Sequence, residues 1–328
     1  MRRMKTKKTR KGLGNVPQLS ISIAFVVVFI VFSLCTSSFL TSSNIVNMLR
    51  QSSTNLIIAI GMTYVLILGG IDLSVGSIAC LSAIVGASLM TGSTGAGTDL
   101  FAPLPLLPSM LVAVVLAALC GLLNGLVITR LSLPPFIVTM AMQSIARGVA
   151  LVYSGGYPVS ALPETATQIA RGDVIGIPYT VLIMAVILAM MWFILRCSKF
   201  GRYVFAIGGN EECARLSGVK VKTVKVIVYA VSGIMSGLAG LLVAFKMASA
   251  QPTLGNSYEL DAITAVALGG TSLAGGKGNM LGTVIGCLFL TVLSTGFTIL
   301  SISPYWQQIF KGIILIIAIS LYRDEKSK

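Results

Sequence analysis

The sequence predicts an all-α polytopic membrane protein, and three observations indicate this class. Of the 328 residues, 55% are hydrophobic and only 10% are charged, whereas about 25% of the residues of a soluble domain are charged. The mean hydropathy is +0.92. The apolar residues gather in long runs that glycine, proline and basic clusters separate, and such runs are typical of helices that cross a bilayer.

About ten transmembrane helices fit the apolar runs. Several runs are shorter than the roughly 20 residues that a helix needs to cross a bilayer, and glycine or proline interrupts them. We therefore expect some spans to be broken or partly re-entrant. The prediction is a basic cytoplasmic tail at 1–18, a transmembrane domain at 19–322 and a second cytoplasmic tail at 323–328. The expected spans lie at about 19–34, 55–68, 109–129, 136–153, 178–196, 224–246, 259–272, 281–300 and 305–322, with one more run ending near 90, while the polar segment 36–54 and the loop 154–177 connect spans.

Basic residues lie mostly on one predicted side of the membrane. The formal net charge is +14, and lysine and arginine cluster in the N-terminal tail and around 197–222. Basic segments beside spans set orientation and contact anionic lipid headgroups, so we expect membrane lipid as a partner and no nucleic acid. With the N terminus inside, the outside segments hold only Arg50, Arg171 and Lys246. The sequence therefore predicts that both termini and segment 197–222 face the cytosol.

The segment 197–222 is the sizeable polar stretch between two long apolar runs, and it carries a short helix signature. Asn210 suits an N-cap, acidic residues follow it in the first turn, and Gly218 suits the C′ position. A helix of about two turns is unstable alone in water. We therefore expect a neighbouring element or a soluble partner to hold it. The residues predicted for this contact are Asn210, Glu211, Glu212, Arg215, Leu216 and Gly218.

A repeat occurs at an offset of 200 residues. The pattern Leu68-Gly69-Gly70-x-x-Leu73-x-x-Gly76 recurs at 268–276, and internal duplication explains it better than chance. Both copies fall at predicted cytoplasmic hairpins. Asp72 is interpreted first as a cap of the helix that follows, with a substrate contact or a hinge as alternatives. The predicted hairpin or gate residues are Gly69, Gly70, Asp72, Gly76, Gly269, Gly270, Gly275, Gly276 and Lys277.

The source of energy separates the possible functions. An ion-coupled carrier needs acidic or histidine side chains within its spans, but the chain has no histidine, and Asp72, Glu259 and Asp261 lie at predicted span ends. A phosphate-binding loop requires GxxxxGK[ST], and the stretch around Lys277 has Thr271 and Gly278 in the wrong places. No metal cluster or nucleophile–base pair is visible, which argues against a membrane-embedded enzyme. We expect no cofactor, and ATP hydrolysis on a separate subunit.

Small residues at four-residue spacing mark two helices that approach a neighbour closely. The pairs are Gly121 with Gly125 and Gly233 with Gly237, and such spacing favours tight helix packing. Packing within the chain is the preferred interpretation, and a homodimer contact is the alternative. The six cysteines form no CxxC pair and are interpreted as small apolar residues.

From about residue 40 onward the chain resembles the permease subunit of ribose-type ABC importers. The resemblance rests on the motifs at 69–77, 208–218, 249–252, 258–262 and 268–278. It implies an ABC importer permease fold in the cell inner membrane, a homodimeric or paired permease, a cytosolic ABC ATPase subunit and a solute-binding protein. It also implies that the helix at 210–218 is the coupling helix and that the solute is ribose or a similar monosaccharide. Another small polar solute remains an alternative, and an ion-coupled secondary carrier is a weaker one.

Overall fold

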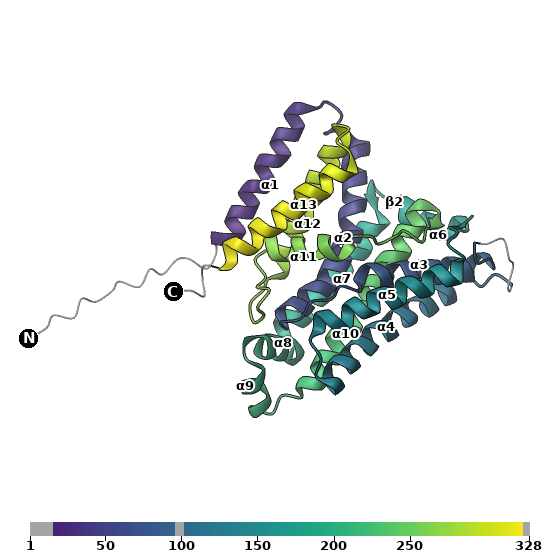
Figure 1. Ribbon diagram of the computed structural model, residues 1–328. Helices are drawn as coiled ribbons and strands as arrows, with labels where there is room; N and C mark the ends of the chain where they lie inside the picture. The colour runs from purple at the N-terminus through teal and green to yellow at the C-terminus, as the bar shows by residue number, and fades with distance from the viewer. Residues whose placement is uncertain (1–15, 96–101, 324–328) are drawn as a thin grey trace, which may run out of the picture.

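The computed structural model describes residues 16–95 and 102–323, and helices dominate it (Figure 1). The predicted tails therefore lie mostly outside the described residues. The helices are α1 (Val16–Cys35), α2 (Ser42–Ile67), α3 (Val75–Thr91), α4 (Leu106–Leu131), α5 (Pro135–Ser154), α6 (Glu164–Arg171), α7 (Tyr179–Cys197), α8 (Lys199–Gly209), α9 (Glu211–Leu216), α10 (Val221–Met247), α11 (Tyr258–Leu268), α12 (Met280–Ile299) and α13 (Pro304–Arg323).

In the part of the chain that the structure describes, four two-residue strands form two small antiparallel pairs. Strand β1 (Val159–Ser160) pairs with β4 (Ser249–Ala250), and β2 (Asp173–Val174) pairs with β3 (Ile177–Pro178). The first pair joins the segment after α5 to the segment after α10. These strands pin connections between helices and form no layer of their own.

Length and composition identify the helices that cross a membrane. Within the described residues, α4, α5, α7, α10 and α12 are long and apolar enough to span it, and α3 is a shorter apolar helix. The most apolar windows of α10 and α12 are each 61% buried, against 22% in α5 and 17% in α7. Thus α10 and α12 belong to the core, whereas α5 and α7 leave apolar surface for lipid. The predicted all-α polytopic class is confirmed.

Helices α4 and α10 pack closely through the small residues that the sequence singles out. A Cβ added to Gly121 would lie 2.2 Å from the Tyr229 carbonyl oxygen, and one added to Gly233 would lie 2.3 Å from the Ala117 carbonyl oxygen. No side chain larger than hydrogen fits such an approach without displacing backbone. The interpretation of these glycines as packing positions within the chain is therefore confirmed.

Three segments are more helical than the sequence analysis expects. Helix α2 begins at Ser42, not near 55, because no glycine or proline interrupts 42–60 and its hydroxyls bond back to helix carbonyls, as Ser52 does to Leu49. The loop 154–177 contains α6, whose first turn holds Glu164 and whose last turn holds Arg171. The third addition is α8, which precedes the predicted short helix.

Helix α11 occupies the predicted span 259–272, but it is too short to cross a membrane. Its 11 residues give a length of about 16 Å, roughly half of a bilayer core. The extended and turning segment 249–257 precedes it, and Gly255 in that segment packs against Gly76 of α3. The prediction that broken elements occur among the spans agrees with this geometry.

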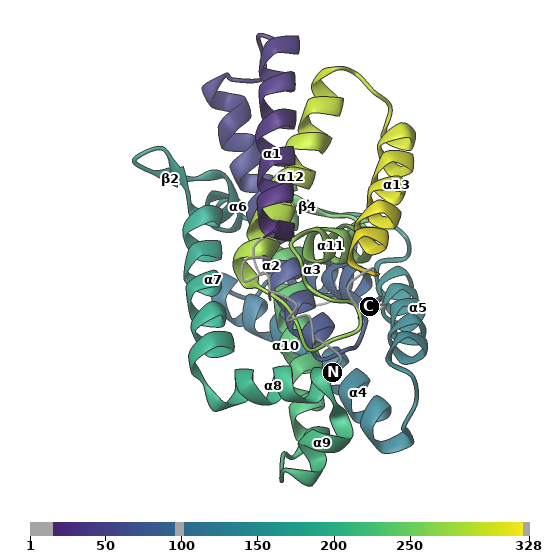
Figure 2. The same cartoon turned by 90° about the vertical axis from the view of Figure 1, so that its left-hand side faces the viewer.

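The two ends of α10 carry different surroundings. Helices α8 and α9 lie beside its first turns, at the lower end in Figure 2. Near its last turn, Arg171 donates a 3.0 Å hydrogen bond from Nε to the Lys246 carbonyl, and Arg50 donates to the Arg171 carbonyl. The three basic residues predicted to lie outside thus gather near one end of α10, and α9 lies near the other.

Candidate functional site

Helix α9 has the two ends that its sequence predicts. The Asn210 side chain accepts a 2.9 Å hydrogen bond from the Cys213 amide, as an N-cap residue does. Gly218 has a φ of 84°. The Gly218 amide donates to the Arg215 carbonyl and the Val219 amide donates to the Ala214 carbonyl, at 3.0 and 3.1 Å. Together these two bonds form a Schellman motif, so six helical residues are closed at both ends.

The charged side chains of α9 have partners within the chain. Arg215 donates two hydrogen bonds to the Glu212 carboxylate, at 3.0 and 2.6 Å. This bonding holds the pKa of the Glu212 carboxyl below its ordinary value. Lys225 of α10 donates to both Glu211 oxygens at 2.7 Å, which ties α9 to the long helix. Leu216 is different, because 76% of its surface is exposed.

Helix α8 connects this exposed segment to the rest of the molecule. Its N-cap Ser198 accepts a 3.1 Å hydrogen bond from the Gly201 amide. At its other end, Gly208 lies so close to α2 that an added Cβ would be 1.8 Å from the Ile67 carbonyl oxygen. Gly276 donates a 2.8 Å hydrogen bond from its amide to the same oxygen. The end of α8, the end of α2 and the loop before α12 thus meet at backbone distance, and we call this contact the glycine junction.

The predicted hairpin glycines divide between this junction and other contacts. A Cβ on Gly275 would lie 2.7 Å from the Gly208 carbonyl oxygen and 2.9 Å from the Gly69 Cα. Gly275 and Gly69 therefore belong to the glycine junction together with Gly276. Three of the other predicted glycines pack against different neighbours: Gly70 against the Tyr229 hydroxyl, Gly76 against Gly255 and Gly269 against Gly282. Gly270 turns the chain with a φ of 90°. The Lys277 side chain is exposed.

Asp72 does not take the N-cap position that its interpretation as a cap requires, since Ser74 is the N-cap of α3. It is completely buried. Its Oδ1 accepts bonds from the Ser74 amide and hydroxyl at 3.0 and 2.5 Å, and its Oδ2 accepts a 2.7 Å bond from the Ser232 hydroxyl of α10. The Asn124 amide of α4 extends this network with a 2.9 Å bond to the Ser74 hydroxyl. The carboxylate therefore joins α3, α4 and α10.

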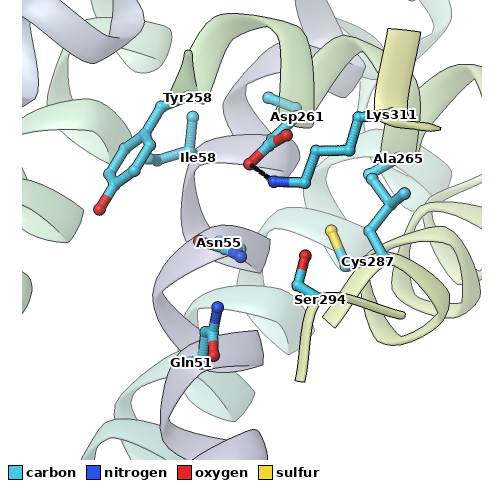
Figure 3. Close-up of a pocket in the computed structure, with 11 residues that line it drawn as sticks. Gln51, Asn55, Ile58, Tyr258, Asp261, Ala265, Cys287, Ser294 and Lys311 are labelled. Atoms are coloured by element: carbon cyan, nitrogen blue, oxygen red, sulfur yellow. Dashed lines mark hydrogen bonds and ion pairs between the residues drawn. The ribbon is translucent and has the colours of Figure 1, made fainter. Parts of the chain in front are cut away.

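A polar cleft opens between α2, α11, α12 and α13 (Figure 3). The Lys311 ammonium pairs with the Asp261 carboxylate at 2.8 Å, although the sequence shows no acid near Lys311. Arg147, a second cation within a predicted span, donates to the Pro252 and Leu254 carbonyls at 2.6 and 2.8 Å. Both half-buried cations thus find hydrogen-bond acceptors that are distant in sequence, a carboxylate for Lys311 and two backbone carbonyls for Arg147.

Sequence reasoning missed three parts of these sites. Gly208 and Gly209 directly precede the predicted N-cap Asn210. Two consecutive glycines are a sequence signal for a close approach of the backbone to a neighbouring segment. In the cleft, Gln51 and Asn55 lie four residues apart on α2, a spacing that predicts neighbouring side chains. The partnership of Asp261 with Lys311 had no local signal.

Helices apolar enough to cross a membrane, an exposed capped helix at one end and a polar cleft within the bundle are features expected of a membrane transport protein. The chain belongs to the family described as branched-chain amino acid transport system / permease component, which matches residues 44–319. The expected transport role, rather than an enzymatic one, is confirmed. The chain is a multi-pass protein of the cell membrane.

Similar proteins narrow the group further. The chain is 40% identical to the ribose import permease protein RbsC of Haemophilus influenzae, over 90% of each chain. It is 40% identical to that of Bacillus subtilis, over 96% of this chain and 95% of the relative. It is 35% identical to the galactose/methyl galactoside import permease protein MglC of Escherichia coli, over 92% of each. No solved structure matches. The resemblance to the permease subunit of ribose-type ABC importers is confirmed.

Proposed function

We propose that this chain forms the translocation path for a monosaccharide, ribose or a similar sugar, in an ATP-driven importer of the cell inner membrane. The relatives named for ribose, for galactose and methyl galactoside, and for allose support a sugar substrate. A permease of this kind works with a cytosolic ATPase subunit and with a solute-binding protein. The solute-binding protein selects the sugar. Another small polar solute is the alternative. It is favoured if a solute-binding protein that partners this chain binds no monosaccharide.

The observation that supports ATP-driven transport, through docking of an ATPase, is the exposed Leu216 on α9. The ion pairs of α9 are made within the chain, so its charged side chains already have partners. A large apolar side chain with 76% exposure at the end of a capped cytosolic helix suits a groove on another protein. In this proposal α9, with Asn210, Glu211, Glu212, Arg215, Leu216 and Gly218, docks on the ATPase, and the glycine junction carries its displacement to α2 and α12.

The proposed orientation places both termini and α8–α9 in the cytosol. The end of α10 away from α9 carries Arg50, Arg171 and Lys246, whereas seven basic residues, at positions 196, 199, 202, 215, 220, 222 and 225, lie in or beside α8 and α9. This difference supports the orientation, because the cytosolic side is the one enriched in basic residues. The 27 residues of α10 separate the two sides by about 40 Å. We also propose that two permease chains pair in the complex and that basic residues beside the spans contact lipid headgroups.

Substitution of Leu216 tests the docking of α9. Leu216→Asp should fold and insert normally, because the side chain is exposed, yet it should abolish co-purification of the ATPase and sugar uptake. A charge placed in an apolar groove costs several kcal/mol. Leu216→Met is the matched control, since it keeps an apolar contact and should retain both activities. Normal association and uptake with Leu216→Asp contradict the docking role.

Labelling of Cys213 tests the orientation. This thiol is exposed, as are Cys35 and Cys197, so the Cys35→Ser, Cys197→Ser background is needed. A membrane-impermeant maleimide should leave Cys213 unlabelled in intact cells and label it after permeabilisation. Efficient labelling in intact cells contradicts the cytosolic placement of α9.

A further inference from the structure

We infer that the cleft between α2, α11, α12 and α13 is a sugar-contacting site within the membrane domain, where hydroxyl groups of the solute bind during passage. This inference rests on the proposed import of a monosaccharide. It deepens that proposal by naming residues that touch the solute, whereas the sugar choice made by a solute-binding protein lies outside this chain.

The cleft is built from matching faces of three helices. The cleft is lined by residues 51, 55 and 58 of α2, by residues 258, 261, 262 and 265 of α11, and by residues 287, 290 and 294 of α12. These spacings of three, four and seven residues each select one side of a helix. Lys311 of α13 closes the fourth side. In Figure 3 the side chains of Asn55, Ser294 and Lys311 converge on the space in front of Asp261.

The chemistry of the lining suits a neutral, polyhydroxylated ligand. Asp261 and Lys311 bring one negative and one positive charge, so the cleft has no net charge to attract an ion. The carboxamides of Gln51 and Asn55 both donate and accept hydrogen bonds, as sugar hydroxyls do. Buried apolar side chains form its floor, and they can meet the C–H faces of a sugar ring. These floor residues are Ile58, Ala262, Ala265, Cys287 and Leu290.

The polar groups at the cleft remain accessible, which distinguishes it from the Asp72 network. The Asp261 and Lys311 side chains retain 24% and 26% of their exposure, and Gln51, Asn55 and Ser294 are half-buried. Asp72, by contrast, is fully buried; its Oδ1 accepts from the Ser74 amide and hydroxyl, and its Oδ2 accepts from the Ser232 hydroxyl. A group that serves only structure is best closed off from solvent, whereas a transient ligand needs an opening.

The ion pair closes the site in this conformation. The cavity measures ≈ 30 Å³, which is room for a water molecule or two and not for a sugar. Lys311 lies on α13, which packs chiefly on α11 and α12. Separation of α13 from α11 would break the 2.8 Å contact between Lys311 and Asp261 and enlarge the cavity. Sugar hydroxyls then replace the ion-pair partners as hydrogen-bond donors and acceptors.

Two adjacent positions on α12 provide a matched test by labelling. Ser294 lines the cleft, and Thr295 next to it does not. Ser294→Cys and Thr295→Cys are placed singly in a cysteine-free permease, assembled with its ATPase and solute-binding protein in lipid nanodiscs. Reaction with methanethiosulfonate ethylammonium is followed with vanadate present, with and without D-ribose on the binding protein. D-Ribose should slow labelling of Ser294→Cys by about fivefold or more and leave Thr295→Cys unchanged.

Uptake by Asn55→Ala provides the second readout. Loss of one hydrogen bond to the sugar in the path should lower D-ribose turnover by roughly five- to tenfold. The KM for the loaded binding protein and the amount of co-purified ATPase should stay constant. Unchanged labelling of Ser294→Cys, equal protection of Thr295→Cys, or unchanged uptake by Asn55→Ala each overturns the inference alone. Absence of uptake of ribose, galactose and allose by the unmodified transporter contradicts the proposed function, and the inference falls with it.

Discussion

The loop at 68–74, between α2 and α3, and the loop at 269–279, between α11 and α12, begin alike and end differently. Both preceding helices stop at a left-handed glycine, Gly69 with a φ of 87° and Gly270 with a φ of 90°. In both, the amides at and after this glycine bond back to the last helical turn, which is the Schellman pattern. The helix stop is thus shared, with a shift of one position in the repeat.

The repeat also preserves one turn at the same register. The Asp72 carboxylate accepts a 3.0 Å bond from the Ser74 amide, and the Ser272 hydroxyl accepts a 3.2 Å bond from the Ala274 amide. Side-chain acceptors two residues before an amide form Asx and ST turns. The match at positions 72 and 272 supports internal duplication more directly than the glycine count does.

After this turn the two loops part. Val75 begins α3, whereas α12 begins only at Met280, beyond the repeat position of Val75. The first loop is locked into the core by the bond from Ser232 to Asp72. In the longer second loop, Gly275 and Gly276 pack against Gly208 and Gly209 of α8, and the Gly276 amide donates to the Ile67 carbonyl at the end of α2. One copy therefore fixes the bundle, and the other meets the segment that we propose to dock on the ATPase.

The largest expected effect follows from Gly208→Ala, because this substitution disrupts the glycine junction, to which both loops contribute residues. The added Cβ would lie 1.8 Å from the Ile67 carbonyl oxygen and 2.6 Å from the Gly276 amide nitrogen. Relief requires a backbone shift, which costs about 3 kcal/mol. The midpoint of thermal unfolding of the purified permease should fall by roughly 6 °C, and sugar uptake should fall with it.

Gly209→Ala is the matched control for that prediction. Gly209 is the next residue of α8, and its added Cβ would meet nothing within 4 Å. Alanine is favoured over glycine in a helix, so this variant should unfold at an unchanged or slightly higher temperature. Equal destabilisation by the two alanines would show that the glycine junction has no special tightness.

Sequence reasoning reached the helices of this fold because local signals define them. The caps of α9 at Asn210 and Gly218 follow from residue chemistry alone. The start of α2 at Ser42 was missed because serine and threonine resemble loop residues until their hydroxyls bond to helix carbonyls, as Ser53 does to Leu49. Helix α8 was missed because its glycines argue against a helix unless a neighbour requires their small size.

The sites depended on contacts between distant segments, which no local pattern contains. Lys311 meets Asp261 across 50 residues, and Asp72 meets Ser232 across 160. The sequence identified Gly69, Gly275 and Gly276 as special, but it could not place α8 between them. The assignment of Leu216 to an ATPase contact remains a prediction, since the partner that would cover it lies outside this chain.

Asp72→Ala should lower the free energy of unfolding more than a substitution at the equivalent position of the second loop. The substitution leaves the Ser74 amide and the Ser232 hydroxyl without their buried acceptor, at a cost of about 2 kcal/mol. Asp72→Asn should cost less, since its carboxamide oxygen can still accept from Ser74 and the Ser232 hydroxyl can accept from its amide. Thermal unfolding in detergent measures both. An alanine variant as stable as the original would show that Asp72 does not hold α3 to α10.

The smallest effect is expected at the equivalent position of the other loop. Ser272→Ala removes only the 3.2 Å bond to the Ala274 amide, and Ser272 is half-exposed, so water can replace the lost acceptor. The stability cost should be about 0.5 kcal/mol, close to the limit of a thermal unfolding measurement. Because Ser272 lies beside the residues that contact α8, a change in uptake at unchanged stability would indicate that this loop transmits motion. A loss as large as that of Asp72→Ala would instead show that both copies of the repeat are structural locks, and it would contradict the division of roles between them.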